Sequence, residues 1–357
     1  MLDYSEPLMV KYLHNKGVAA GIPVSGTFEL TQRCNFNCKM CYVHDCTQKA
    51  DPLTAEEWLK IAQQAKDAGT IFLLLTGGEP LLRDDFEEIY TSLVKMGFLV
   101  SINTNGSLLS EYSSLFDKIP PTRINISLYG ADNYAYKNLC GNNAFDKVMS
   151  SIKQMKDMGI SLCLNTIFTP DNISDYKKII DISKDLNIPL KPTTYAYPPV
   201  RLGRTNEDIR FSPEIAAENI FLIDKYRLDT GIYTNRLNKL LARPEGPNEN
   251  RVRCRAGRAS YWITADGIMR PCGMMPEPDG RPLVDGFEKA WEDIRSATAA
   301  IRIPEECIKC EYAGICNVCA AMCKAETGAF NQVPHYICRM TKHLYSLAER
   351  WKHDNDN

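Results

Sequence analysis

The sequence lacks an excess of charge of either sign and has no long apolar run. Of its 357 residues, 42 are Lys or Arg and 44 are Asp or Glu, so the formal net charge is −2 and no long basic run is present. A surface dedicated to nucleic acid is therefore not expected, because phosphate binding requires concentrated Lys and Arg. The longest apolar stretches, such as residues 71–75, are far shorter than the roughly 20 residues that span a bilayer.

A secretory signal is also missing. Residues 1–10 (MLDYSEPLMV) carry acidic residues where a signal peptide has basic residues and a long apolar block. We therefore expect a cytoplasmic protein that does not associate with membranes. The length predicts about two structural units, and a composition of 44% hydrophobic and 24% charged residues is ordinary for a globular protein.

Cysteine, in contrast, is abundant and unevenly distributed. Of the 14 cysteines, three lie within residues 34–41, eight lie within residues 254–338, and only Cys46, Cys140 and Cys163 fall outside these groups. Disulfides are disfavoured in a protein without a secretory signal, and clustered thiols more often hold metal.

From residue 27 to about residue 199, short β-like runs alternate with helical stretches. The six strand candidates are rich in Ile, Leu, Val, Thr and Phe and cover residues 27–31, 71–76, 99–104, 123–128, 161–169 and 190–197. Thr54 followed by Glu57 predicts a capping box at the start of one of the intervening helices. Six βα units in a row predict a parallel α/β sheet, either open and doubly wound or closed into a whole or partial barrel.

The first cysteine group follows the first predicted strand directly. Cys34, Cys38 and Cys41 have the spacing C-x3-C-x2-C, which allows a short loop to turn three thiolates toward one point. Three thiolates suit a four-iron cluster in which one iron has no protein ligand. Structural zinc requires a fourth ligand, and because His44 could supply it, zinc remains an alternative.

Polar and glycine-rich motifs stand at the ends of the following strands. Residues 76–80 read TGGEP, residues 103–106 read NTNG, residues 127–130 read SLYG, and Asn165 lies late in the fifth strand. The carboxyl ends of parallel strands share one rim, which is where ligands bind in such folds. We therefore expect these motifs to form one site with the cysteine loop.

The combination of the cysteine motif with the GGEP motif resembles the radical S-adenosylmethionine (SAM) superfamily over residues 27–199. The resemblance implies a partial (β/α)6 TIM-like barrel, with a four-iron four-sulfur cluster on Cys34, Cys38 and Cys41 and with SAM chelating its open iron. It also implies a set of SAM-contacting residues along the rim: Met40, Gly77, Gly78, Glu79, Asn105, Ser127 and Asn165. Tyr129 stands where many relatives have Asp, and Lys137 and Leu139 stand near the place of a common Arg, so the cation for the SAM carboxylate is not identified.

The C-terminal cysteines form a second pattern. Alternating apolar residues around Asp266 and Gly267 predict a β-hairpin that brings Cys254 and Cys272 together. The spacing of Cys316, Cys319 and Cys323 predicts that they share one helical face. Eight thiols make two sets of four, and spacing alone fits two zinc sites as well as two iron–sulfur clusters.

This pattern resembles the SPASM extension of radical SAM enzymes, which implies two auxiliary four-iron clusters and three clusters in all. The resemblance implies an outer cluster on Cys307, Cys310, Cys316 and Cys338, and an inner one on Cys254, Cys272, Cys319 and Cys323. If only one of Cys319 and Cys323 is a ligand, the inner cluster has an open iron. The expected organisation is an N-terminal extension (1–26), the barrel (27–199), a connector with a helix (200–253), the SPASM region (254–345) and a C-terminal tail (346–357), frayed from His353.

The resemblance implies reductive cleavage of SAM to a 5′-deoxyadenosyl radical that abstracts hydrogen from a substrate. A peptide or protein is the expected substrate, and crosslinking, oxidation or epimerisation is the expected outcome. Gly273 stands where sulfatase-maturing relatives often have Asp, which argues against that activity. The alternatives are a small-molecule substrate or a non-catalytic iron–sulfur or zinc module.

The expected partners are an external electron donor, such as flavodoxin or ferredoxin, and a separate leader-binding protein. Only about 26 residues precede the first predicted strand, too few for a leader-binding domain of the winged-helix type. If the outcome is epimerisation, Cys140 or Cys163 is the candidate hydrogen donor. The alternative is that Cys163 packs as a small apolar residue and that Cys140 is incidental.

Overall fold

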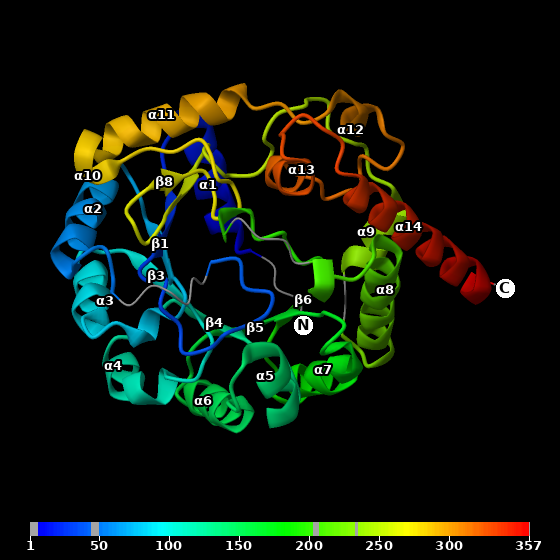
Figure 1. Cartoon of the computed structure of the whole chain (residues 1–357), viewed down its shortest axis with the longest axis horizontal. Coiled ribbons are helices and arrows are strands. Elements are labelled where there is room, and N and C mark those ends of the chain that lie inside the picture. The colour runs from blue at the N-terminus through cyan, green and yellow to red at the C-terminus, as the bar shows by residue number, and fades with distance from the viewer. Residues whose placement is uncertain (1–5, 44–49, 203–206, 233–234, 357) are drawn as a thin grey trace.

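The computed structural model describes residues 6–43, 50–202, 207–232 and 235–356. The fold is built around an eight-stranded sheet with the order β6-β5-β4-β3-β2-β1-β7-β8. Helices surround the curved sheet, and the cysteine-rich C-terminal segments lie beside its open side (Figure 1). This arrangement is a partial (β/α)6 barrel followed by a small cysteine-rich region, as the sequence predicts.

Six strands pair in parallel in chain order. They are β1 (Ser25–Glu29), β2 (Phe72–Thr76), β3 (Leu99–Thr104), β4 (Arg123–Ser127), β5 (Leu162–Ile167) and β6 (Leu190–Thr193). All six predicted strands are therefore confirmed, and their carboxyl ends share one rim.

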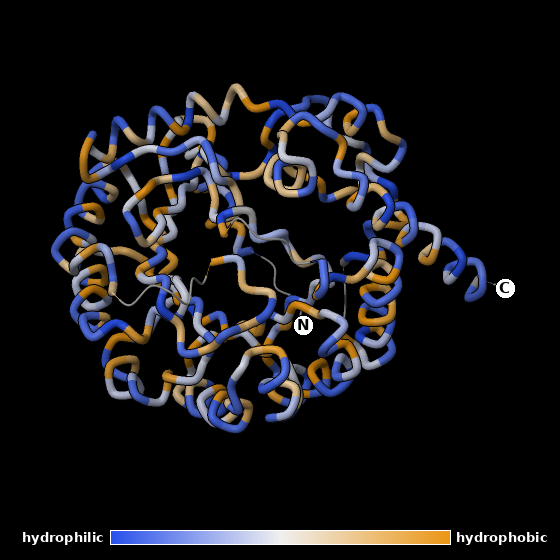
Figure 2. Tube along the Cα trace, in the orientation of Figure 1, coloured by the Kyte–Doolittle hydropathy of each residue, from blue (hydrophilic) through white to orange (hydrophobic). Residues whose placement is uncertain are grey.

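Helices alternate with the strands along the barrel. Those that precede or flank its strands are α1 (Leu8–Ala20), α2 (Ala55–Asp67), α3 (Phe86–Lys95), α4 (Ser113–Lys118), α5 (Asn133–Cys140), α6 (Phe145–Asp157) and α7 (Tyr176–Asp185). The predicted capping box at Thr54 and Glu57 is confirmed at the start of α2. Hydrophilic and hydrophobic residues alternate along these helices (Figure 2), as expected when one face packs on the sheet.

The chain beyond the barrel is mainly helical. It contains α8 (Pro213–Asp229), α9 (Asn235–Ala242), α10 (Pro282–Asp285), α11 (Phe287–Ala300), α12 (Glu305–Lys309), α13 (Ala320–Thr327) and α14 (His335–Asp356). No helix among the described residues is long and apolar enough to cross a membrane.

The predicted hairpin forms and continues the barrel sheet. Strands β7 (Ser260–Ile263) and β8 (Met269–Arg270) are antiparallel to each other. Strand β7 also pairs in parallel with β1, where Thr27 lies opposite Trp262. The sheet is therefore wider than the six predicted strands, and the first part of the cysteine-rich region is attached directly to the barrel.

Two hydrophobic cores are present. The large core joins the sheet to the surrounding helices and includes Phe28, Trp58 and Tyr90, all fully buried. The small core lies in the C-terminal region and includes Met275, Val318 and Cys323. The large core also includes Phe287 and Ala348, so it extends beyond the barrel into the C-terminal part of the chain.

Two local predictions are wrong. Cys316, Cys319 and Cys323 do not share a helical face, because α13 begins only at Ala320 and Cys319 is its extended N-cap residue. The tail beyond His353 continues α14 to Asp356, since no Gly or Pro interrupts the segment and Asn355 bonds back to the carbonyl of Trp351. The last turns of α14 project beyond the rest of the fold (Figure 1).

Candidate functional site

The first three cysteines line one cavity at the carboxyl rim of the barrel. Cys34, Cys38 and Cys41 lie on the loop after β1, and the cavity that they line has a volume of about 490 Å³. Ligand sites in proteins are typically of this order, roughly 300–1,000 Å³. The loop is anchored on α5, because Asn37 N–H donates to the Cys140 carbonyl at 2.9 Å and Lys39 N–H donates to the Leu139 carbonyl at 3.0 Å. His44 and Cys46 lie outside the described residues.

The thiols of this loop are poorly solvated. Burial raises the pKa of Cys34 to about 12, and the nearby Cys38 and Cys41 add to the rise. Binding of iron to these sulfurs therefore has to displace protons. Among the described residues, no three His, Cys, Asp or Glu side chains are grouped closely enough to hold a single metal ion.

The GGEP turn packs against the base of the cysteine loop. Gly78 N–H donates to the Thr31 carbonyl at 2.7 Å, and Glu79 N–H donates to the Arg33 carbonyl at 2.8 Å. A Cβ atom on Gly78 would lie 2.2 Å from the Arg33 carbonyl oxygen, so only glycine fits there without moving the backbone. Gly77 and Gly78 line the cavity, and their lack of side chains leaves backbone exposed to a ligand.

Glu79 lies behind the cavity wall and is fully buried. Its carboxylate accepts hydrogen bonds from the Thr104 hydroxyl (2.8 Å) and from the N–H groups of Asn105 (2.7 Å) and Leu81 (3.1 Å). Burial raises the pKa of Glu79 to about 7, although these hydrogen bonds act in the opposite direction. Glu79 thus joins the GGEP turn to the end of β3.

The other predicted SAM contacts lie around the same cavity. Met40, Asn105, Ser127 and Asn165 all line it, and Ser127 lies opposite Asn165 in the register of β4 and β5. Asn105 Nδ2 is 2.8 Å from Asn35 Oδ1 and 3.9 Å from the Cys34 sulfur. The structure therefore brings these side chains together with the three thiols.

The sequence interpretation missed one charged residue of this cavity. Lys191 is the charged side chain among the described lining residues, and it lies opposite Asn165 in the register of β5 and β6. The alternation of β6 places Lys191 on the same face as Thr193, which also lines the cavity. That alternation is the signal that could have identified Lys191.

The two candidate hydrogen donors lie outside the cavity lining. Cys140 is fully buried at the end of α5, where its thiol contacts that of Cys38. Cys163 is fully buried on β5, opposite Asn125. Among the described residues, neither lines this cavity or the second one described below, and the positions favour a packing role for both.

Four of the C-terminal thiols gather around a cavity of about 240 Å³. They are Cys307, Cys310, Cys316 and Cys338. Burial raises the pKa of Cys307 to about 11, and the other three thiols of this set add to the rise. This set has the same members as the outer group that the resemblance implies.

Three further thiols form an inner group. Burial raises the pKa of Cys272 to about 12, and the nearby Cys254 and Cys319 add to the rise. Cys323 is buried in the first turns of α13, where burial raises its pKa to about 12, and the Cys307 and Cys319 thiols add to the rise. Cys323 therefore lies between the two groups, whereas Cys319 lies with Cys254 and Cys272.

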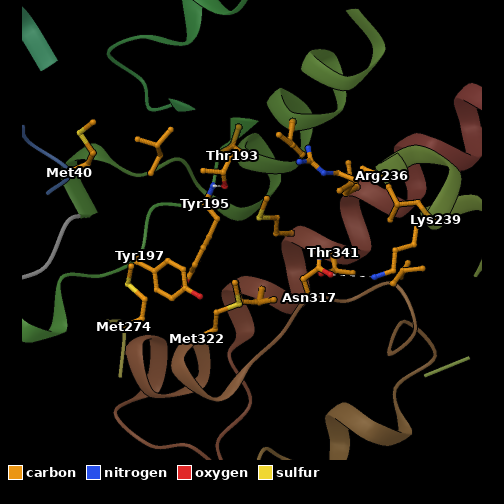
Figure 3. Close-up of a pocket in the computed structure, with 18 of the residues that line it drawn as sticks. Met40, Thr193, Tyr195, Tyr197, Arg236, Lys239, Met274, Asn317, Met322 and Thr341 are labelled. Carbon is orange, nitrogen blue, oxygen red and sulfur yellow. Dashed lines mark hydrogen bonds between the residues drawn. The ribbon is translucent and has the colours of Figure 1, made fainter. Parts of the chain in front are cut away.

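A second cavity, of about 370 Å³, continues from the first one into the cysteine-rich region. Met40, Tyr42, Ile167 and Thr193 line both cavities. Figure 3 shows Met40 at one end, Arg236 and Lys239 at the other, and Tyr197, Met274 and Met322 along the wall between them. This cavity is therefore a candidate substrate site beside the candidate SAM site.

The inner thiol group reaches this second cavity through one side chain. The Tyr197 hydroxyl is 3.7 Å from the Cys319 sulfur, and Tyr197 lines the cavity. Only the Tyr197 side chain would therefore separate a ligand in the second cavity from the Cys319 thiol.

The comparisons with known proteins agree with this geometry. Residues 28–182 match the model of the Radical SAM superfamily. A probable GTP 3′,8-cyclase from Sulfurisphaera tokodaii is 32% identical over 251 residues, which cover 68% of this chain and 79% of the relative. An AdoMet-dependent heme synthase from Methanosarcina barkeri is 26% identical over 343 residues, which cover 88% of this chain and 96% of the relative. The chain belongs to the radical SAM superfamily.

Solved structures share the fold of this radical SAM enzyme. Streptococcus suis SuiB bound to S-adenosylmethionine superposes with a TM-score of 0.70 at 18% identity, covering 93% of this chain and 83% of that chain. A structure of anSMEcpe with bound AdoMet gives a TM-score of 0.71 at 16% identity, covering 92% of this chain and 97% of that chain. The shared fold covers more than nine tenths of this chain in both superpositions and is therefore not limited to the barrel.

The residues of the first cavity fit the cofactors of a radical SAM enzyme. Three soft thiolate donors line one wall, which suits iron–sulfur ligation. The Gly77–Gly78 turn exposes backbone on the neighbouring wall, and the polar side chains of Asn105, Ser127 and Asn165 complete the lining. The cavity thus offers donors for a cluster and hydrogen-bonding groups for a polar ligand such as SAM.

A buried ion pair fixes the Cys272 loop over the barrel of this radical SAM enzyme. Arg201 donates to both carboxylate oxygens of Glu29, at 2.9 and 3.0 Å, and Trp262 Nε1 donates to the same carboxylate at 2.9 Å. Arg201 also reaches the Gly273 carbonyl at 3.4 Å. The side chains of Arg201 and Glu29 are 9% and 0% exposed, so water cannot replace a lost partner.

Replacing Arg201 should therefore destabilise the fold. We expect Arg201→Gln to lower the free energy of unfolding by about 3–5 kcal/mol, because it leaves the Glu29 carboxylate buried without its cation. Anaerobic chemical denaturation measures the change. The control is Arg339→Gln. Arg339 makes a similar two-bond pair with Glu214, but the two side chains are 63% and 34% exposed, so the expected loss of stability is much smaller than that of Arg201→Gln. Equal losses in both variants would contradict the structural role given to Arg201.

Proposed function

We propose that this radical SAM enzyme abstracts a hydrogen atom from a peptide or protein whose reacting residue enters the second cavity. The observation that carries the proposal is the junction of the two cavities, where Met40, Tyr42, Ile167 and Thr193 line both. A substrate in the second cavity would meet SAM at this junction. Structures of the same fold contain bound peptides, namely SuiB with precursor peptide SuiA and anSMEcpe with the Kp18Cys peptide.

The chain's own residues would position the reactants. When bound, the cluster and SAM supply a 5′-deoxyadenosyl radical that takes hydrogen from the substrate. Gly77, Gly78 and Asn165 would hold SAM at the rim, and Met40 and Ile167 would confine the reacting carbon to the junction. Holding two reactants in the right relative position accelerates a reaction, because the loss of translational and rotational entropy has already occurred on binding. The mainly apolar wall of the second cavity would keep water away.

We propose that the C-terminal thiols hold two auxiliary clusters. The outer group of Cys307, Cys310, Cys316 and Cys338 would be fully ligated by the protein. The inner group of Cys254, Cys272 and Cys319 would leave one iron without a cysteine ligand, on the side of Tyr197. An external electron donor, such as flavodoxin or ferredoxin, would reduce the SAM-binding cluster, and a separate leader-binding protein would present a peptide substrate.

A small-molecule substrate is the second candidate. The heme synthase relative aligns with 88% of this chain, and its name implies a small-molecule product. A cavity of about 370 Å³ is also large enough for an ordinary small ligand.

One experiment separates the two substrate classes. Cells that encode this protein are grown in deuterated medium, and their extract is divided into macromolecular and low-molecular-weight fractions. Each fraction is incubated anaerobically with the reconstituted enzyme, unlabelled SAM and reductant. The peptide proposal predicts deuterated 5′-deoxyadenosine from the macromolecular fraction, and protease treatment of that fraction should reduce the signal. Deuterium transfer only from the low-molecular-weight fraction would contradict the peptide proposal and favour the small molecule.

A further inference from the structure

The second cavity carries its charge at one end only. Its described walls are mostly apolar, with Met, Ile and Leu side chains and three tyrosines, and its charged lining residues are Arg236 and Lys239. No carboxylate is among the described lining residues. Figure 3 shows both cations at the end opposite Met40, which is the residue shared with the SAM cavity.

The surroundings leave this end positively charged. Asp224 is fully buried behind it, and its carboxylate lies 3.0 Å from Arg236 Nη1 and 3.6 Å from Arg227 Nη1. Two guanidinium groups thus share the Asp224 carboxylate, and Lys239 adds a further positive charge at this end of the cavity. Lys239 itself donates to the neutral Asn317 side chain at 3.4 Å.

The same end opens toward the surface. Lys239 and Asn317 also line a neighbouring pocket of about 420 Å³, whose other charged lining residues are Arg251, Arg253 and Glu245. The Arg236 side chain is 32% exposed. A ligand entering from this side would meet the cations first and the apolar wall next.

We propose that Arg236 and Lys239 bind a carboxylate group of the substrate, while its apolar part lies along the methionine-rich wall toward SAM. The proposal rests on the proposed function, since it takes the second cavity as the substrate site. An ion-paired hydrogen bond in a partly buried site is stronger than one between neutral groups. Anchoring the carboxylate at the far end would set which carbon of the substrate reaches the junction with the SAM cavity.

A pair of matched probes tests the charge requirement without knowledge of the substrate. The probes are 4-(1-naphthyl)butyrate and its uncharged amide, titrated by calorimetry into the reconstituted enzyme with SAM present. The wild-type protein should bind the carboxylate at least about tenfold more tightly than the amide. The Lys239→Gln variant should lose most of this preference, and so should the double variant that combines Lys239→Gln with Arg236→Gln. Both should bind the amide as the wild type does.

The control is Lys225→Gln, because Lys225 is exposed on α8 and is not among the residues that line the cavity. This variant should keep the preference for the carboxylate. Equal binding of the two probes by the wild type would overturn the proposal, as would equal loss of both probes in Lys239→Gln. Cleavage of SAM without substrate is measured in the wild type and in Lys225→Gln, where it should be the same, so a failure of the anion site is distinguishable from a failure of the radical chemistry.

Discussion

Replacing Cys34, Cys38 and Cys41 together with alanine is expected to abolish SAM cleavage and to lower the iron content by about four atoms per chain, one four-iron cluster. The three thiols line a single cavity together with the Gly77–Gly78 turn. Alanine leaves no soft donor on this wall, so neither the cluster nor the chelation of SAM can form there. The measurements are iron and sulfide per chain and 5′-deoxyadenosine formed with reductant.

The control for this triple variant is Cys163→Ala, which removes a buried cysteine that lies outside the cavity lining. It should keep both its iron and its SAM cleavage. The auxiliary clusters should remain in the triple variant, because none of the eight C-terminal thiols lines the cavity of the first three cysteines. Undiminished formation of 5′-deoxyadenosine by the triple variant would contradict the assignment of the site.

Cys319 and Cys323 should differ sharply when each is replaced by alanine. The reconstituted wild type is expected to hold about twelve iron atoms, three four-iron clusters. Cys319→Ala should lose about four of them, because Cys319 lies with Cys254 and Cys272 and an inner cluster on two thiols would not persist. Cys323→Ala should keep all three clusters, since Cys323 is buried in α13 between the two groups.

Iron analysis and electron paramagnetic resonance of the reduced proteins measure this difference. The two variants control for each other, since both remove one thiol from the same short segment. Loss of a cluster in Cys323→Ala with retention in Cys319→Ala would reverse the assignment. Zinc in place of iron after anaerobic preparation would instead show that the C-terminal region is a structural zinc fold.

The sequence predicts most of the first cavity for a simple physical reason. In a parallel sheet, the carboxyl ends of all strands meet at one rim, so the cysteine loop, GGEP, Asn105, Ser127 and Asn165 come together once the six strands are recognised. Each of these residues lies within a short distance of its strand in the chain. Local sequence patterns and one rule of parallel-sheet topology are therefore enough to predict most of the first cavity.

The remaining features depend on contacts between distant segments. The pairing of β7 with β1 joins residues more than 200 positions apart, and no local pattern indicates it. The start of α13 at Ala320 separates Cys319 from Cys323, although their spacing is helical. Arg236 and Lys239 lie on a helix with no recognisable motif, and they reach the second cavity only because that helix packs beside the cysteine-rich region.

A crystal structure of the anaerobically reconstituted protein with SAM, with anomalous data collected at the iron edge, tests the central claim most directly. The account predicts an iron cluster on Cys34, Cys38 and Cys41, with SAM on its open iron, between the Gly77–Gly78 turn and Asn165. The adenosyl C5′ atom should face the junction at Met40, Tyr42, Ile167 and Thr193, where the second cavity begins. SAM bound elsewhere, or a C5′ atom turned away from that junction, would contradict the account.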